Sequence, residues 1–154
     1  MRLHRRKTSY AVLIASLIVA ASAFGHVRVA PRESAAGATE HYTMSVPTER
    51  QSPTVRIEIQ FPAAIRVASL APAPGWKAEE KKDAGGKIIG AVWIGGSIAF
   101  ADRMDFHFDA TNPASEMKLE WKVIQIYEDG TRSEWTGPES SRTPASVTTI
   151  KKVP

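Results

Sequence analysis

The stretch TVRIEIQF, residues 54–61, alternates between apolar and polar side chains from its second residue onward. Apolar residues occupy the odd-numbered positions, with arginine, glutamate and glutamine between them. A period of two is typical of a β-strand that buries one face and exposes the other. We therefore expect Val55, Ile57, Ile59 and Phe61 to face a hydrophobic core.

A second stretch, MKLEWKVIQIY at residues 117–127, repeats this alternation over a greater length. Ile124 and Ile126 interrupt its polar side, which predicts that one end of this strand is covered on both faces. Further strand candidates are EHYTMSV (40–46), RVASL (66–70), KIIGAVWI (87–94) and RMDFHFD (103–109).

Turn-forming residues separate these candidates at short intervals, and no amphipathic helix of useful length is present. Many short strands with frequent turns predict an all-β fold, an immunoglobulin- or cupredoxin-like β-sandwich of about seven to nine strands. The turn EDG, residues 128–130, predicts a three-residue hairpin loop with Gly130 in the left-handed conformation. If Tyr127 then faces Thr131, Trp135 lies opposite Val123 and diagonal to Trp121.

Residues 1–25 have the layout of a secretory signal peptide. Basic residues at positions 2, 5, 6 and 7 precede an apolar run from Tyr10 to Ala21, which is shorter than the roughly 20 residues of a membrane span. We expect a helical leader that is cleaved, and a periplasmic or secreted protein that meets the membrane only if the leader is retained.

Two cleavage sites compete at the end of this leader. A cut after Gly25 makes His26 the first residue, whereas Ala21-Ser22-Ala23 is a better A-x-A site that would leave Phe24 first and His26 third. We expect the cut before His26, followed by a β-sandwich at residues 26–137. The tail at 138–154, rich in Ser, Thr and Pro, is expected to add a last strand at SVTTI (146–150) or to fray.

Removing the leader changes the charge of the chain. The leader holds four of the 20 Lys and Arg residues and none of the 16 Asp and Glu residues, so the remaining 129 residues carry no formal net charge. The excess of positive charge therefore belongs to targeting, and the composition argues against nucleic acid as a partner. The chain also has no cysteine, so a metal site would use nitrogen, oxygen or thioether ligands.

Most catalytic motifs are absent from the sequence, including GxSxG, GxxxxGK[ST] and HExxH. After cleavage, three histidines remain: His26, His41 and His107. His107 lies between Asp105 and Asp109 on one face of a predicted strand, where a ligand set is conceivable but the polar side of a half-buried strand is favoured. His41 is expected at the surface.

His26 differs because proteolysis would free its α-amine. The amine and the imidazole Nδ1 can then bind one metal in a six-membered chelate ring, and two nitrogens completed by oxygen suit Cu(II). With the alternative cut, a histidine in third position also chelates Cu(II), through the amine, two deprotonated amides and Nδ1. The remaining alternative is that His26 only begins a strand.

The sequence resembles the YcnI-like family of exported copper-binding domains. The matching segments, in the order of the family, are HVRVAP, YTMSVPTE, TVRIEIQFP, PAPGWK, VWIGGSI, MDFHF and WKVIQIYEDGTRSEWTG. They cover nearly the whole chain after the leader. The family often has Pro-Pro-Gly where this chain has Ala99-Phe100-Ala101, and it usually has Asn where Thr48 stands.

The resemblance implies a β-sandwich that binds Cu(II) through one N-terminal histidine, a carboxylate and a tryptophan packed close to the metal. Carried over, the histidine is His26 and the carboxylate is Asp105, with Asp102 and Glu49 as the next candidates. The tryptophan is Trp135 rather than Trp121.

We therefore expect a copper-homeostasis or trafficking protein, in the manner of a metallochaperone, that captures copper reversibly and is not an enzyme. A periplasmic or membrane copper transporter or acceptor protein is the expected partner. Two alternatives stay open: a copper-dependent oxidative enzyme, in which His107 would supply a second histidine, and a metal-free β-sandwich that binds a partner.

Overall fold

Strands in two facing sheets build the part of the chain that the computed structural model describes, residues 25–153. The predicted helical leader lies outside these residues except for Gly25. Within them, no helix is long and apolar enough to cross a membrane. The eleven strands of the described part are β1 (Arg28–Ala30), β2 (Glu33–Ala35), β3 (Thr39–Pro47), β4 (Thr54–Gln60), β5 (Arg66–Leu70), β6 (Lys77–Lys82), β7 (Ile88–Ile98), β8 (Arg103–Thr111), β9 (Met117–Tyr127), β10 (Arg132–Trp135) and β11 (Ser146–Lys151).

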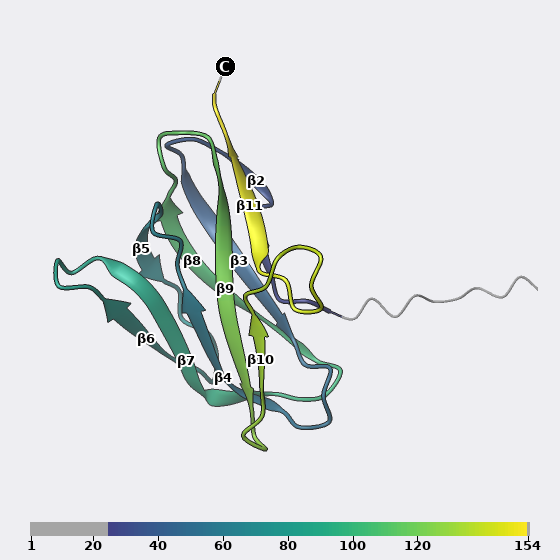
Figure 1. The fold of residues 1–154 in the computed structure, drawn as a ribbon. Helices are drawn as coiled ribbons and strands as arrows, with labels where there is room; N and C mark the ends of the chain where they lie inside the picture. The colour runs from purple at the N-terminus through teal and green to yellow at the C-terminus, as the bar shows by residue number, and fades with distance from the viewer. Residues whose placement is uncertain (1–24, 154) are drawn as a thin grey trace, which may run out of the picture.

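One sheet has the order β1-β3-β8-β5, and the other has the order β2-β11-β9-β4-β7-β6 with β10 also paired to β9. β10 and β11 follow one another along the same edge of β9, and the loop between them bulges outward beside the first described residues (Figure 1). This architecture confirms the predicted all-β sandwich. The strands exceed the expected number because short pieces such as β1 and β2 have no alternation long enough to detect.

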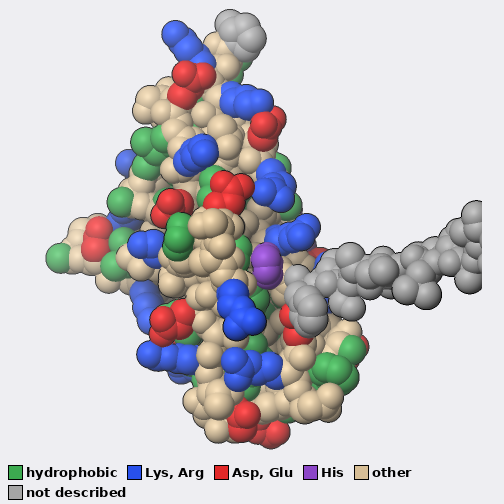
Figure 2. All heavy atoms as spheres, turned by 45° about the vertical axis from the view of Figure 1, so that its right-hand side comes forward, with side chains coloured by type: hydrophobic (Ala, Val, Ile, Leu, Met, Phe, Trp, Pro, Cys, Tyr) green, Lys and Arg blue, Asp and Glu red, His purple; other side chains and the backbone are tan. Residues whose placement is uncertain are grey.

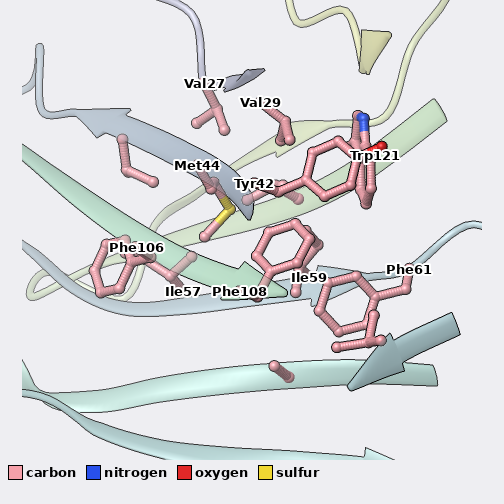
Figure 3. Close-up of a cluster of buried hydrophobic side chains, with 14 of the residues drawn as sticks. Val27, Val29, Tyr42, Met44, Ile57, Ile59, Phe61, Phe106, Phe108 and Trp121 are labelled. Atoms are coloured by element: carbon pink, nitrogen blue, oxygen red, sulfur yellow. The ribbon is translucent and has the colours of Figure 1, made fainter. Parts of the chain in front are cut away.

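The core lies between the sheets, where side chains from β3, β4, β8 and β9 interdigitate (Figure 3). Tyr42, Phe108 and Trp121 are fully buried there, with ring centroids 4.8 Å apart for Tyr42–Trp121 and 5.5 Å apart for Phe108–Trp121. Burial raises the pKa of Tyr42 to about 12, and its phenol donates a hydrogen bond to Asn112 Oδ1 at 2.5 Å.

The alternation that predicted β4 holds for Ile57, Ile59 and Phe61, which are buried, but not for Val55. A register shift between Thr54 and Arg56 changes the phase of the strand, so Thr54 is buried and Val55 is only half-buried. A β-bulge of this kind reorients the side chains that precede it. The buried threonine contributes a hydroxyl group to the site described below.

The hairpin between β9 and β10 confirms the predicted geometry. Tyr127 N donates to Thr131 O at 2.9 Å, and Gly130 has a φ of 81°, the left-handed conformation in which glycine pays no steric cost. Trp135 is consequently opposite Val123.

The last strand expected at residues 146–150 is present as β11, whereas β6 had no signal in the sequence pattern. β11, in the predicted tail, lies inside its sheet, antiparallel to β9 and parallel to β2. β6 has the sequence KAEEKK with every side chain exposed, and it forms an edge of the sheet next to β7. An edge strand without buried side chains has no hydrophobic period to detect.

Candidate metal centre

His26 lies just before β1, at the edge where the two sheets approach each other. Val27 and Val29 on either side of Arg28 point into the core, and β1 pairs with β3 through Arg28 opposite Ser45. Val29 N also donates to the hydroxyl of Ser146 on β11, which ties β1 to the second sheet. The half-buried His26 is therefore held at a fixed place on this edge.

The imidazole of His26 packs against the indole of Trp135. Their ring centroids are 5.5 Å apart with an interplanar angle of 51°, and Trp135 is only 7% exposed. Trp121 lies elsewhere, because it is enclosed by Tyr42, Phe61 and Phe108 and its Nε1 donates to Thr148 Oγ1 at 2.9 Å. Of the two tryptophans considered from the sequence, Trp135 is the one beside His26.

A buried polar network fixes Trp135 and connects it to the end of β3. Trp135 Nε1 donates to Gln125 Oε1 at 3.0 Å, and Gln125 Nε2 donates to Pro47 O at 2.8 Å and to Thr54 Oγ1 at 2.6 Å. The Thr54 hydroxyl also bonds that of Thr48 at 2.7 Å. Because Gln125, Thr54 and Thr48 are all buried, these bonds are shielded from water and define one arrangement of the Pro47–Thr48 segment against Trp135.

Glu49 follows this segment and reaches the backbone next to His26. Gly25 N donates a hydrogen bond to Glu49 Oε1, and a Cβ at position 25 would lie 2.8 Å from Pro47 Cγ. The backbone nitrogen of His26 is one residue further along the chain, within about 4 Å of that of Gly25. The carboxylate of Glu49 is thus close to the atom that becomes the α-amine if the chain is cut before His26.

The other two candidate carboxylates occupy different positions. The backbone of Asp102 is tied to the same segment, since its carbonyl accepts from Thr48 N at 2.9 Å, and its side chain is exposed. Asp105 lies on β8 opposite Ser45, on the outer face of the four-stranded sheet. It is two strands away from β1, which is about 10 Å across the sheet.

His107 and His41 lie on that same outer face, away from His26. The pairing of β1, β3 and β8 puts His107 level with Ala30, four residues or about 13 Å along the strand direction from His26. The two outer histidines stack on each other, with ring centroids 5.3 Å apart. The structure therefore does not bring His107 to His26 as a second ligand.

A groove of about 410 Å³ opens beside His26, between β1 and the start of β11. Its lining includes the cationic side chains of Arg28 and Arg32 and the carboxylate of Glu139. Charged groups of both signs are mixed over the side of the molecule shown in Figure 2, in keeping with the equal numbers of acidic and basic residues among residues 26–154.

Within residues 25–153, no three His, Asp or Glu side chains converge as a preformed metal site. A site at His26 would depend on a backbone amine that only proteolysis creates, so side chains alone do not reveal it. The donor set available there, an imidazole, an amine once freed and the Glu49 carboxylate, consists of nitrogen and oxygen ligands that suit Cu(II).

The sequence interpretation missed Gln125. A signal was present, because Gln125 is the single polar residue on the apolar side of the alternation in MKLEWKVIQIY. A polar side chain in such a position must find buried hydrogen-bond partners, and here the partners connect Trp135 to β3.

Known proteins are similar to this chain over most of its length. The family described as "Domain of unknown function (DUF1775)" matches residues 26–150. "Copper-binding protein CutI" of Bacillus subtilis (strain 168) is 37% identical over 142 residues, which is 91% of this chain and 69% of that protein.

Solved structures share the fold at low sequence identity. An uncharacterized protein from Nocardia farcinica with an immunoglobulin-like fold has a TM-score of 0.71 at 23% identity, covering 81% of this chain and 97% of that chain. A cohesin module from a Clostridium perfringens ATCC13124 family 33 glycoside hydrolase has a TM-score of 0.55 at 12% identity, covering 84% of this chain and 100% of that chain. These similarities confirm the immunoglobulin-like sandwich and concern the fold alone.

Proposed function

The chain belongs to the DUF1775 family, the YcnI-like family that its sequence resembles, and on that premise we propose that it is an exported protein that binds Cu(II) at a processed N-terminal His26. The name of the Bacillus subtilis relative supports copper as the ligand. The observation that carries the proposal is the grouping of His26 with Trp135 on one side and Glu49 on the other.

In this proposal, His26 supplies two of the ligands, its α-amine and its imidazole Nδ1. Glu49 supplies the oxygen ligand, in preference to Asp105, because its carboxylate already accepts a hydrogen bond from the backbone next to His26. Its negative charge offsets part of the charge of the metal. In this proposal copper takes part in no reaction, because the ion is the species that the protein binds and carries.

Trp135 would shield one side of the metal from water and report its arrival by a loss of fluorescence. The network through Gln125 keeps the indole in place without a contribution from the metal. The groove lined by Arg28 and Arg32 leaves another side open, and an open side permits transfer of copper to an acceptor in the periplasm or at the membrane. We propose reversible capture and transfer rather than catalysis.

The first test is the intact mass of the exported protein, which identifies the cut. A chain that begins at His26 supports the proposal, whereas a chain that begins at Phe24 replaces the two-nitrogen chelate with one in which His26 is third. Titration of the processed protein with Cu(II), followed by tryptophan fluorescence and paramagnetic resonance, then measures binding. His26→Ala should abolish the high-affinity event, and unchanged affinity and spectrum would exclude the terminal chelate.

The chain offers a matched pair of variants for the carboxylate. Glu49→Gln should weaken Cu(II) binding about tenfold, which corresponds to about 1.4 kcal/mol, because the amide cannot supply a negatively charged oxygen. Asp105→Asn is the control and should leave the affinity unchanged. The opposite result, with loss only in Asp105→Asn, would assign the ligand to β8 instead.

A further inference from the structure

Two histidines and an aspartate lie side by side on the outer face of the four-stranded sheet, away from His26. His41 on β3 and His107 on β8 are diagonal neighbours, since His41 is opposite Asp109 and Thr43 is opposite His107. Their rings are nearly parallel, with an interplanar angle of 15° and centroids 5.3 Å apart. Both histidines are at least partly open to solvent.

Each ring is already held through the same nitrogen. Asp109 Oδ1 lies 2.6 Å from His41 Nδ1, and Thr43 Oγ1 lies 3.0 Å from His107 Nδ1. Among residues 25–153, neither Nε2 atom has a hydrogen-bond partner. For His41, the carboxylate on Nδ1–H keeps the proton on that nitrogen and leaves the lone pair on Nε2, which is the arrangement that ligating histidines use in metal sites. The Thr43 hydroxyl can accept from His107 Nδ1–H in the same way.

The spacing of the rings also fits a shared ion. An imidazole nitrogen lies about 2.0–2.1 Å from bound zinc, so each ring centre lies about 3 Å from the metal and two adjacent ligands have centres about 4.5–5 Å apart. The observed separation of 5.3 Å exceeds this by a few tenths of an ångström. Because the rings are nearly parallel, with an interplanar angle of 15°, at least one ring must also rotate about its side-chain bonds for both Nε2 lone pairs to point at one ion.

We propose that His41 and His107 form a binding site for a divalent transition-metal ion of the kind that imidazole favours, such as Zn(II) or Cu(II). Asp109 acts as a positioning residue that holds the His41 ring, and water completes the coordination. Because only two protein ligands hold the ion at an exposed face, it is released and rebound rapidly. The site is separate from His26 and does not rest on the function proposed for that residue.

The test uses the processed protein and Zn(II) alone, because zinc is diamagnetic and lets histidine ring signals be followed by NMR. We expect the signals of His41 and His107 to shift together along one binding curve. His41→Ala and His107→Ala should each weaken that event at least tenfold, since a single imidazole cannot chelate. Asp109→Asn should weaken it as well, by about tenfold.

Two further variants make the outcome decisive. His26→Ala should leave the joint shift of His41 and His107 in place, and Thr111→Ala, on the same face of β8, should do the same. The proposal is overturned if the two rings do not respond to zinc. It is equally overturned if they titrate independently, with His107→Ala leaving the curve of His41 unchanged.

Discussion

Trp121 and Trp135 point to the same side of neighbouring strands, yet their surroundings differ. Both indoles are buried and both N–H groups have a partner, Thr148 for Trp121 and Gln125 for Trp135. Trp121 is enclosed by aromatic rings of the core, whereas Trp135 has the imidazole of His26 against it. Burial alone therefore does not separate a tryptophan that stabilises the sandwich from one that belongs to a site; the identity of the neighbours does.

The largest expected effect comes from removing the core tryptophan. Trp121→Ala should lower the free energy of unfolding by about 3–5 kcal/mol, because it leaves a large cavity among Tyr42, Phe61 and Phe108. Urea denaturation followed by circular dichroism measures this. Trp121→Phe is the control and should lose less. A loss below about 1 kcal/mol for the alanine variant would mean that Trp121 is not a principal part of the core.

The next effect concerns the buried hydrogen-bond network of Gln125, which holds Trp135 but not Trp121. Gln125→Leu should cost about 1–3 kcal/mol of stability, since it leaves Trp135 Nε1 and Pro47 O buried without partners. It should also weaken Cu(II) binding of the folded protein, because Trp135 and the segment before Glu49 lose their connection. Gln60→Leu, at an exposed position of β4, is the matched control and should change stability by less than about 0.5 kcal/mol. Equal effects of the two variants would contradict the role assigned to the network.

Trp135→Phe tests the tryptophan that packs against His26. The phenyl ring preserves most of the packing but cannot donate to Gln125 Oε1, so we expect a stability loss of about 1 kcal/mol. The fluorescence change on addition of Cu(II) should largely disappear, while Trp121 continues to emit. Titration of the variant beside the unsubstituted protein checks this. Undiminished quenching would place the metal near a different tryptophan.

The smallest effect is a gain in stability in the loop that supports the site. Ala101 has a φ of 65°, a left-handed conformation that costs a residue with a Cβ about 1 kcal/mol, and its N donates to Thr48 O at 2.8 Å. Ala101→Gly should raise the free energy of unfolding by about 0.5–1 kcal/mol without altering that hydrogen bond. Thermal unfolding is sufficient to detect the change. A decrease would show that the entropy of the glycine outweighs the relief of strain.

The sequence was most informative where one physical rule acts alone. Alternation located the strands around Ile57 and Trp121, and glycine chemistry fixed the hairpin at Gly130 and with it the position of Trp135. The alternation was wrong at Val55 because a β-bulge, which depends on the neighbouring strands, shifts the phase.

The candidate site was harder to predict because it joins segments that are distant in the chain. His26, Glu49 and Trp135 come from three parts of the sequence. The pairing of β3 with β1 and of β10 with β9, together with the Gln125 hydrogen bonds that join the two sheets, brings them together. Asp105 was the first candidate for the carboxylate because it precedes an aromatic residue. That local feature does not show how far β8 lies from His26 in the sheet, and the assignment of Asp105 as the ligand remains a prediction to be tested against Glu49.

The charged edge strand β6 has a consequence for self-association. An exposed edge can pair with the same edge of a second molecule and extend the sheet. In a symmetric antiparallel pairing of two KAEEKK strands, Lys77 would face Lys82 and Glu79 would face Glu80 of the second copy. Like charges directly opposite are destabilising in such a ladder. The order of charges along this strand thus disfavours its most symmetric edge-to-edge dimer, although the strand as a whole is close to neutral.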